Sequence, residues 1–446
     1  MENTNDLRTQ PIGKLLIKYS IPAIIAMGVN AIYNIVDRMF IGKYVGEEAL
    51  AGLTIAFPIM MIIFAVAALI GHGGASLISI KLGENDNIGA SHVFTNVVVM
   101  AVVSGLFMIA LGALNLHRLL SALGADQEVL IYAKDYMNII FVGVIFQLLA
   151  FNLNNVVRAE GFPVLTMKSM VVSGVVNIIL DYIFIGLMGI GVKGAALATI
   201  IGQMVGLLIL LNHFRKGKSN LKINIKGLLP DKKVVGKILS VGSPTFITTV
   251  GTSASMMLLN SYLGKYGGTP AITSMGAINS LYTLFIMPIM GIQGGMQPII
   301  GYNYGAKEFL RVKEALLKAI GIGIAFSLMV FAILQLSPET FILMFLDESS
   351  DTVGIAVTGL RIYIAILPIL CINMFGSAYF QAIANSKKAI VLGGLRQFIY
   401  LVPLLLILPH FFNLKGVWMS VPVADFMAVV TTLALLIPDI KKHENT

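Results

Sequence analysis

The chain has 446 residues, of which 57% are hydrophobic and only 12% are charged. A soluble domain carries about 25% charged residues, so this composition excludes an ordinary soluble protein and indicates a polytopic membrane protein. The net charge of +9 is concentrated in alternate connections between apolar runs, as a topology signal would be, so nucleic-acid binding is not indicated.

Apolar runs of the length needed to cross about 30 Å of hydrocarbon recur along the chain. No signal-peptide cleavage site follows the first run, so we expect it to remain in the mature protein as a membrane span. A lone cysteine, Cys371, excludes an intramolecular disulfide and a cysteine-based metal site. The twelve expected spans are 15–41, 50–72, 93–114, 132–155, 166–187, 194–213, 236–262, 273–300, 316–336, 355–381, 390–409 and 417–437.

The distribution of Lys and Arg predicts the orientation of these spans. Most of the 31 basic residues fall on the side that also carries both termini, so the positive-inside rule places the termini in the cytoplasm of a cell-membrane protein. The ninth connection is acidic and should lie outside; its acidic residues are Glu339, Asp347, Glu348 and Asp351.

The two halves of the sequence repeat. The pattern that runs from Pro22 to Tyr44 returns from Pro244 to Tyr266, which defines a constant shift between the two copies. The same shift relates Gly73 to Gly295, Gly83 to Gly305, and Lys193-Gly194 to Lys415-Gly416. Six spans per copy is an even number, so both copies should have the same orientation in the membrane.

The repeat defines the expected fold and its divisions. We predict an all-α polytopic membrane protein with twelve transmembrane helices in two pseudo-symmetric six-helix bundles. The expected divisions are an N-lobe at 1–214, a basic cytoplasmic linker at 215–237 and a C-lobe at 238–446. A cavity is expected between the lobes.

Asp37 is the most informative residue of the first span. A carboxylate inside a membrane span costs free energy and is usually retained for function. Asn30 and Asn34 precede it at helical spacing, so the three side chains should form a polar stripe that avoids lipid.

Polar residues in the next spans could complete a site with Asp37. Asn177 and Asp181 follow Ser173 at four-residue steps in the fifth span. The same step joins Ala195, Thr199 and Gln203 in the sixth span, and Asn155 ends the fourth. Carboxylate, amide and hydroxyl oxygens suit a hard cation such as Na⁺, and two carboxylates in apolar surroundings also favour H⁺.

The repeat supplies an internal control for these polar positions. At the shift that carries Pro22 onto Pro244, Leu259 replaces Asp37 and Val421 replaces Thr199. The scaffold therefore does not need polar groups there, which favours a functional role. Asn30, Asn34 and Ser173 could instead make hydrogen bonds between helices.

Other polar residues leave alternatives open. Arg158 and Glu160 could pair with each other and cap the fourth span. Asp425 is either a second coupling group or a structural partner for Arg396 or Arg361. His72 has no neighbouring metal ligands and suits an interface or a cavity wall.

No nucleotide-binding loop of the GxxxxGK[ST] type and no hydrolase motif is present, so we expect an ion-driven transporter and not an enzyme. No cofactor is expected beyond the coupling ion. The lipid bilayer is an expected partner, without nucleic acid or an obligate protein partner.

Three separated segments resemble the multidrug and toxic compound extrusion (MATE) family. They are Asn155 to Pro163 (NVVRAEGFP), Gln297 to Lys307 (QPIIGYNYGAK), and the pattern from Pro22 to Asp37. The resemblance implies the two-bundle fold and the export of cationic, often aromatic, drugs in exchange for H⁺ or Na⁺.

Within that family, the chain resembles the branch with its cation site in the N-lobe. The residues that match this branch's site are Asp37, Asn177, Asp181 and Thr199, with Asn34, Asn155, Ala195 and Gln203 as possible supports. The branch with carboxylates in the seventh and tenth helices is not matched, because the seventh span has none and the tenth carries Arg361. The alternative is a flippase for lipid-linked precursors, although such a cavity should be more cationic.

Overall fold

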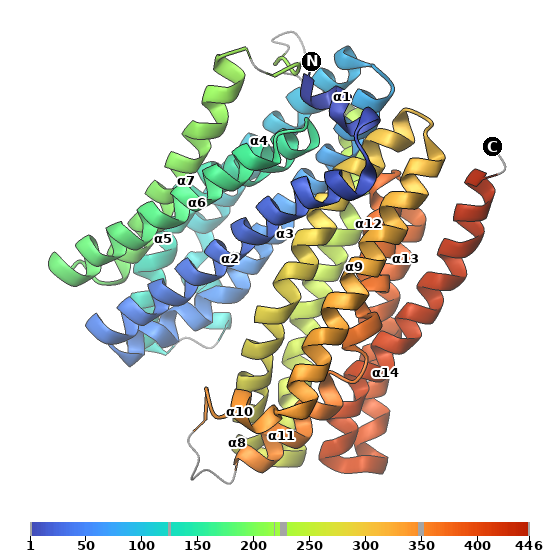
Figure 1. Cartoon of the computed structure of the whole chain (residues 1–446). Helices are drawn as coiled ribbons and strands as arrows, with labels where there is room; N and C mark the ends of the chain where they lie inside the picture. The colour runs from blue at the N-terminus through green and yellow to red at the C-terminus, as the bar shows by residue number, and fades with distance from the viewer. Residues whose placement is uncertain (1, 124–125, 218, 224–229, 347–351, 445–446) are drawn as a thin grey trace. The chain divides into compact units, whose positions relative to one another are not determined.

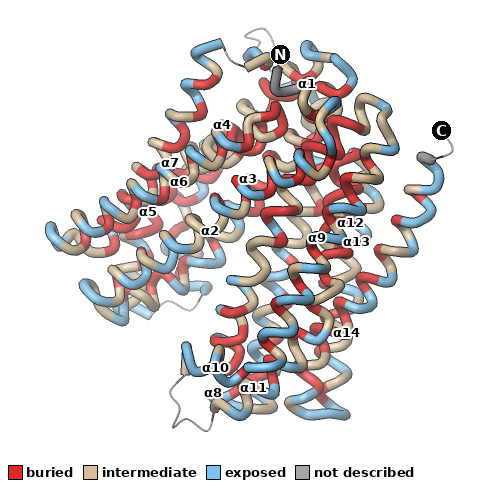
Figure 2. Tube along the Cα trace, in the orientation of Figure 1, coloured by how far each residue is buried: buried red, intermediate tan, exposed pale blue. Residues whose placement is uncertain are grey.

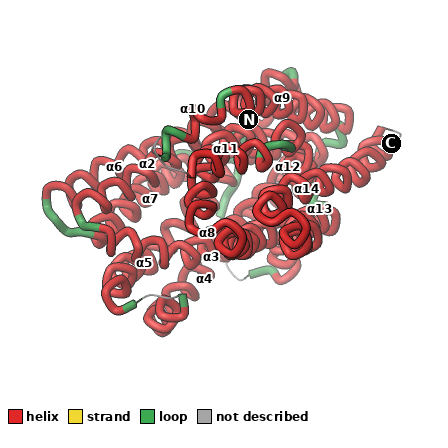
Figure 3. Tube along the Cα trace, turned by 90° about the horizontal axis from the view of Figure 1, so that it is seen from below, coloured by secondary structure: helices red, strands yellow, loops and turns green. Residues whose placement is uncertain are grey.

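The computed structural model describes residues 2–123, 126–217, 219–223, 230–346 and 352–444. Within these residues every regular element is a helix (Figures 1 and 3). The elements are α1 (Glu2–Thr9), α2 (Ile12–Tyr44), α3 (Glu47–Gly83), α4 (Asn87–Ala122), α5 (Gln127–Ala159), α6 (Pro163–Asp181), η1 (Tyr182–Leu187), α7 (Val192–Arg215), α8 (Lys232–Gly305), α9 (Phe309–Leu336), α10 (Pro338–Ile342), α11 (Thr352–Tyr363), α12 (Leu367–Ala382), α13 (Ser386–Gly394), η3 (Leu395–Leu401) and α14 (Val402–Glu444).

The membrane spans match the predicted number once two long helices are divided. In the described part of the chain, nine helices are long and apolar enough to cross a membrane, and the bent pair α11 and α12 makes ten. α8 contains the non-helical Gly268, and α14 contains the non-helical Asn413. Dividing both helices at these residues gives the twelve predicted spans and confirms the all-helical membrane fold.

The tenth span differs from the single helix predicted over 355–381. α11 and α12 meet at a bend of 51°. Pro368 lies in the first turn of α12, where its missing N–H leaves no helical hydrogen bond to break. The proline therefore begins a new helix instead of continuing the preceding one.

The chain forms two compact units. One comprises Met1–Gln10 and Ile21–Gly242, and the other comprises Pro11–Ser20 and Ser243–Thr446. α2 thus passes from one unit to the other immediately before Pro22. Parts of the basic linker predicted at 215–237 (218 and 224–229) and of the acidic ninth connection (347–351) lie outside the described residues.

The backbone repeats with the shift found in the sequence. Residues with positive φ, a conformation that L side chains seldom adopt, recur at Gly46 and Gly268 and at Gly191 and Asn413. Asn85 and Lys307 form a third such pair, with φ values of 60° and 59°. The shift is the same for each pair, so the turns of the two copies share their conformations as well as their positions.

Gly73 and Gly295, which the repeat relates, allow the same close helix contact in each unit. A Cβ on Gly295 would lie 2.8 Å from the backbone N of Ser20. A Cβ on Gly73 would collide with the carbonyl of Ile238 and lie 3.0 Å from the N of Gly242, which corresponds to Ser20 in the repeat. These glycines therefore let the helix backbones touch.

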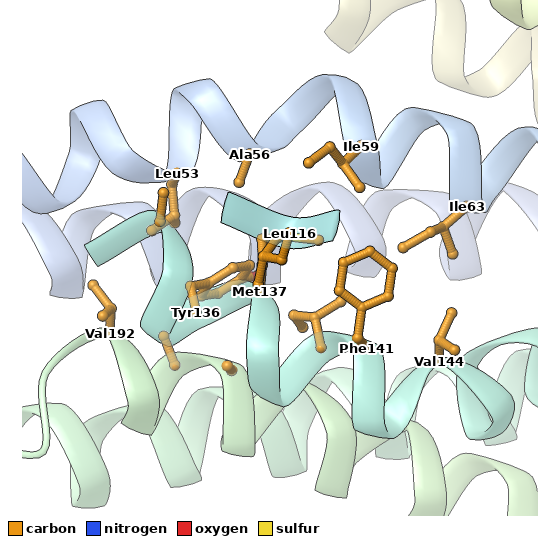
Figure 4. Close-up of a cluster of buried hydrophobic side chains, with 14 of the residues drawn as sticks. Leu53, Ala56, Ile59, Ile63, Leu116, Tyr136, Met137, Phe141, Val144 and Val192 are labelled. Carbon is orange, nitrogen blue, oxygen red and sulfur yellow. The ribbon is translucent and has the colours of Figure 1, made fainter. Parts of the chain in front are cut away.

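Each unit has its own apolar core, and burial is distributed along the inner faces of the helices (Figure 2). The core of the first unit gathers side chains from α3, α4, α5 and α7 around Tyr136, Met137 and Phe141 (Figure 4). Large apolar side chains also cover the outside, with Leu114 80% exposed and Leu336 83% exposed. An apolar exterior of this kind suits contact with lipid.

Candidate cation-coupling site

Asp37 lies buried in the half of α2 that belongs to the first unit, with 7% of its surface exposed. Its Oδ1 atom is buried and has no hydrogen-bond partner among the described residues. One turn earlier, Tyr33 accepts a hydrogen bond at its hydroxyl from Asn30 Nδ2 at 3.3 Å. The predicted polar stripe on α2 is therefore buried at Asp37, but the burial of its side chains changes along the helix.

Asn34, an expected supporting residue, does not join the buried group. Its side chain is exposed, and its amide donates back to the carbonyl oxygen of Asn30 at 2.7 Å. Helical spacing placed Asn34 on the side of Asp37, but the side chain of Asn34 remains exposed, whereas its neighbour Tyr33 lies against Gly174 of α6.

Asp181 and Asn177 lie on the buried face of α6. Asp181 is 0% exposed and Asn177 is 2% exposed. Both carboxylate oxygens of Asp181 and the Oδ1 atom of Asn177 lack a hydrogen-bond partner within the described residues. Asp181 is the last residue of α6 and is followed directly by the π-helical segment η1. Such segments are frequent at functional sites.

Glycines bring the neighbouring helices close to these side chains. A Cβ on Gly202 of α7 would lie 2.7 Å from the carbonyl oxygen of Ser173 and 3.2 Å from Cβ of Asn177. A Cβ on Gly174 of α6 would lie 2.7 Å from Val29 of α2. α6 is thus held closely between α7 and α2, and polar groups from all three helices can meet.

The structure brings together the four principal residues of the predicted site. Asn177 Nδ2 lies 3.5 Å from Thr199 Oγ1, and Asp37 and Asp181 are near enough to interact electrostatically. The group contains four buried oxygens without partners: one each from Asp37 and Asn177, and two from Asp181. An unpaired buried polar atom costs roughly 1–3 kcal/mol, and more if charged, so this arrangement favours a cationic guest.

Two tyrosines near the cluster were missed by the sequence reasoning. Tyr136 of α5 is 3% exposed; it interacts electrostatically with Asp37 and Asp181, and its hydroxyl is in hydrogen-bonding reach of Thr199. Tyr33 also lies near Asp37. Tyr33 could have been found, because it stands one helical turn before Asp37. Tyr136 is far away in sequence and required the packing of α5.

The remaining supporting residues contribute less. Asn155 is buried, but its amide donates to the carbonyl oxygen of Phe151 on its own helix at 2.9 Å. Ala195 is buried and offers no side-chain ligand, and Gln203 is half-buried. Asn152, also on α5, has a buried Oδ1 without a partner among the described residues.

The chemistry of the donor set suits a hard monovalent cation or a proton. No group of three or more His, Cys, Asp and Glu side chains that could hold a metal ion occurs among the described residues. A site here therefore depends on amide and hydroxyl oxygens beside the two carboxylates. That oxygen set fits Na⁺, and the carboxylates alone can take up H⁺.

Arg158 and Glu160, for which pairing with each other was one alternative, have other partners. Arg158 Nη2 donates to Asn154 Oδ1 at 2.9 Å. Glu160 is fully buried, lies 3.2 Å from His213 Nε2, and accepts hydrogen bonds from Ser219 Oγ and the backbone N of Asn220. Glu160 therefore fastens the chain that follows α7, a role set by tertiary packing that sequence spacing could not show.

The structure shows which arginine pairs with Asp425 and which side chain His72 contacts. Arg396 Nε donates to Asp425 Oδ1 at 2.6 Å, whereas Arg361 is exposed and its carbonyl accepts from Gln335 Nε2. His72 is half-buried and makes an edge-to-face ring contact with Phe151, at 5.9 Å between centroids.

The residues of the two repeats match the sequence profile of one family, MatE, over 22–183 and 244–407. The chain belongs to the MatE family. Members of this family are transporters and not enzymes. The multidrug export protein MepA of Staphylococcus aureus is 27% identical over 427 residues, covering 96% of this chain and 94% of that protein. MepA of Staphylococcus haemolyticus is 29% identical, covering 96% and 93%.

Solved MATE structures share the whole fold. An outward-facing multidrug resistance MATE transporter of the MOP superfamily superposes with a TM-score of 0.93 at 27% identity, covering 100% of this chain and 99% of that one. A MOP superfamily transporter from Pyrococcus furiosus, described as having a binding pocket of reversed polarity, gives 0.94 at 27% identity with coverage of 100% and 99%. The two-lobe, twelve-helix MATE architecture therefore applies to this multi-pass membrane protein.

Proposed function

We propose that this MATE protein is a secondary active multidrug efflux antiporter. It exports lipophilic cationic compounds in exchange for inward H⁺ or Na⁺. The observation that carries the proposal is the group of buried, unpaired oxygens of Asp37, Asn177 and Asp181 in the N-lobe. The related MepA proteins, named for multidrug export, support drug export as the function.

Drug export and ion uptake are coupled because the ion and the drug bind to different conformational states of the protein. In an outward-open state, Asp37 and Asp181 take up the ion, and their negative charge is compensated. α2 then shifts about Pro22, next to the point where it passes between the compact units, and the drug site loosens. In an inward-open state, the ion leaves and the exposed carboxylates attract a new cationic drug. Antiport requires only that drug and ion favour different states.

The lobes 1–214 and 238–446 are the moving parts in this proposal, and the basic segment 215–237 links them. The distribution of Lys and Arg supports a cell-membrane orientation with both termini in the cytoplasm. An antiporter of this design needs no further protein subunit, because the ion gradient supplies the driving force.

Efflux from proteoliposomes tests the proposal. A fluorescent lipophilic cation is loaded, and a Na⁺ gradient and a pH gradient are imposed in separate experiments. We expect one gradient to drive efflux in the wild type and neither to drive it in Asp37→Asn. Asp135→Asn is the matched control, because Asp135 carries the same charge in the same lobe but pairs at the surface with Lys193 at 3.3 Å. Folded wild-type protein that moves no dye under either gradient would contradict the proposal.

A further inference from the structure

The C-lobe holds a second buried charge cluster, distinct from the N-lobe oxygens. Arg396 lies in η3 and donates from Nε to Asp425 Oδ1 of α14 at 2.6 Å. The side chain of Asp425 is 7% exposed, whereas that of Arg396 is 20% exposed. The carboxylate is thus enclosed, whereas the arginine side chain is partly exposed.

Two tyrosines from other helices complete this cluster. Tyr282 of α8 and Tyr363 of α11 meet edge to face, with ring centroids 5.5 Å apart and an interplanar angle of 89°. Both rings lie within electrostatic reach of Asp425 and Arg396. Four elements therefore converge on one anion, one cation and two aromatic rings.

The repeat relates one member of this cluster, Asp425, to a residue that was considered for the N-lobe site. At the shift that carries Pro22 onto Pro244, Asp425 is the counterpart of Gln203. Gln203 lies on α7, and Asp425 lies on the helix that corresponds to α7 in the second copy. The fifth span of each copy also contains a π-helical segment beside a charged residue: η1 follows Asp181, and η3 contains Arg396. The two segments do not coincide at the repeat shift, so each is a local feature of its own copy. Segments of this kind are frequent at functional sites.

We propose that Asp425, Arg396, Tyr282 and Tyr363 form a second binding site, for an aromatic cation. The ligand's positive charge replaces the guanidinium at Asp425, and its rings pack on the two tyrosines. The exchange keeps the buried carboxylate compensated, which matters because breaking a buried ion pair without replacing the charge is strongly unfavourable. Aromatic faces attract cations and repel anions, so the tyrosines favour this ligand class.

This inference rests on the proposed export of cationic compounds and names a subsite for them. In this arrangement Arg396 acts as a tethered competitor of the ligand. Removing Arg396 should therefore strengthen binding, whereas removing the charge of Asp425 should weaken it. A purely structural ion pair would not give effects of opposite sign.

Equilibrium binding of ethidium to the purified protein in detergent, without any ion gradient, tests the site. We expect Asp425→Asn to weaken binding about tenfold and Arg396→Gln to tighten it several-fold. Tyr363→Leu should weaken binding, while Tyr363→Phe, which keeps the ring, should preserve it. Asp439→Asn is the control, because Asp439 is a buried C-lobe carboxylate that pairs elsewhere, with Tyr379 and Lys388.

The double variant Arg396→Gln/Asp425→Asn covers the case in which Arg396→Gln alone does not fold. It leaves no unpaired charge, and we expect it to bind ethidium as weakly as Asp425→Asn does. Unchanged binding in Asp425→Asn and in the double variant would overturn the second site. That outcome would leave antiport intact, because gradient-driven efflux and its loss in Asp37→Asn are measured separately.

Discussion

Asn177 of α6 and Thr199 of α7 face each other across 3.5 Å, from Nδ2 to Oγ1, at the long end of hydrogen bonding. The amide of Asn177 is thereby turned toward α7, and its Oδ1 remains buried without a partner among the described residues. The contact therefore orients an oxygen ligand while leaving that oxygen available.

Replacing Thr199 by valine should remove one oxygen while keeping the helix packing. The repeat already has Val421 at the corresponding position, so the fold tolerates this side chain. We expect the ion concentration for half-maximal efflux to rise about tenfold, in line with losing a hydrogen bond or ligand to a charged group. The melting temperature in detergent should not change. An unaltered ion dependence would remove Thr199 from the site.

Tyr136→Phe tests the residue that the sequence did not reveal. The ring belongs to the buried core shown in Figure 4, so phenylalanine should fill the same space. Loss of the hydroxyl near Thr199 should raise the ion concentration for half-maximal efflux several-fold without a drop in melting temperature. If only the melting temperature falls, Tyr136 serves packing alone.

Gly202→Ala should disturb the site through the backbone. Its Cβ would lie 2.7 Å from the carbonyl oxygen of Ser173, so α7 must move away from α6 and Thr199 away from Asn177. We expect reduced ion-driven efflux and a lower melting temperature. Gly321→Ala on α9 is the control, because a Cβ there meets no atom within 4 Å. Equal behaviour of the two variants would contradict the close-packing argument.

Asp86 gives a stability prediction with a defined pH dependence. It caps α4 by accepting from the backbone N of Gly89 at 2.8 Å, and this hydrogen bond, with Lys81 beside it, holds the pKa of Asp86 below its usual range. Because the pKa of Asp86 is lower in the folded state, the cap stabilises the protein fully at pH values above the ordinary aspartate pKa. This stabilisation is lost as the pH falls through the pKa that Asp86 has in the folded state. Asp86→Ala should cost about 1 kcal/mol at neutral pH. Melting curves should show this gap closing below about pH 4.

The repeat and most of the fold could be predicted from the sequence because both depend on local patterns. The shift that carries Pro22 onto Pro244 was found in the sequence, and the structure repeats positive φ at the same shift in Gly46 with Gly268 and in Gly191 with Asn413. The position of the bend before Pro368 could not be fixed, because a hydropathy run does not show whether a proline interrupts a span or begins a new helix.

The burial of the candidate site residues was predicted where helical spacing sufficed and missed where tertiary packing decides. Asp181 and Asn177 share a buried face, as their spacing of four residues indicated. Asn34 satisfies the same rule but is exposed, because spacing gives the side of a helix and not how deeply each turn is covered. Tyr136 and the partners of Glu160 come from distant segments that no local pattern relates to the site.

The central claim is that the oxygens around Asp181 bind the coupling ion. The most direct test of this claim is ion uptake by the purified protein. Radioactive Na⁺ binding and proton release are measured on wild type and Asp181→Asn, with Asp135→Asn as the surface control. We predict saturable uptake of Na⁺ or H⁺ in the wild type and the control, and its loss in Asp181→Asn. Undiminished uptake by folded Asp181→Asn protein would contradict the account.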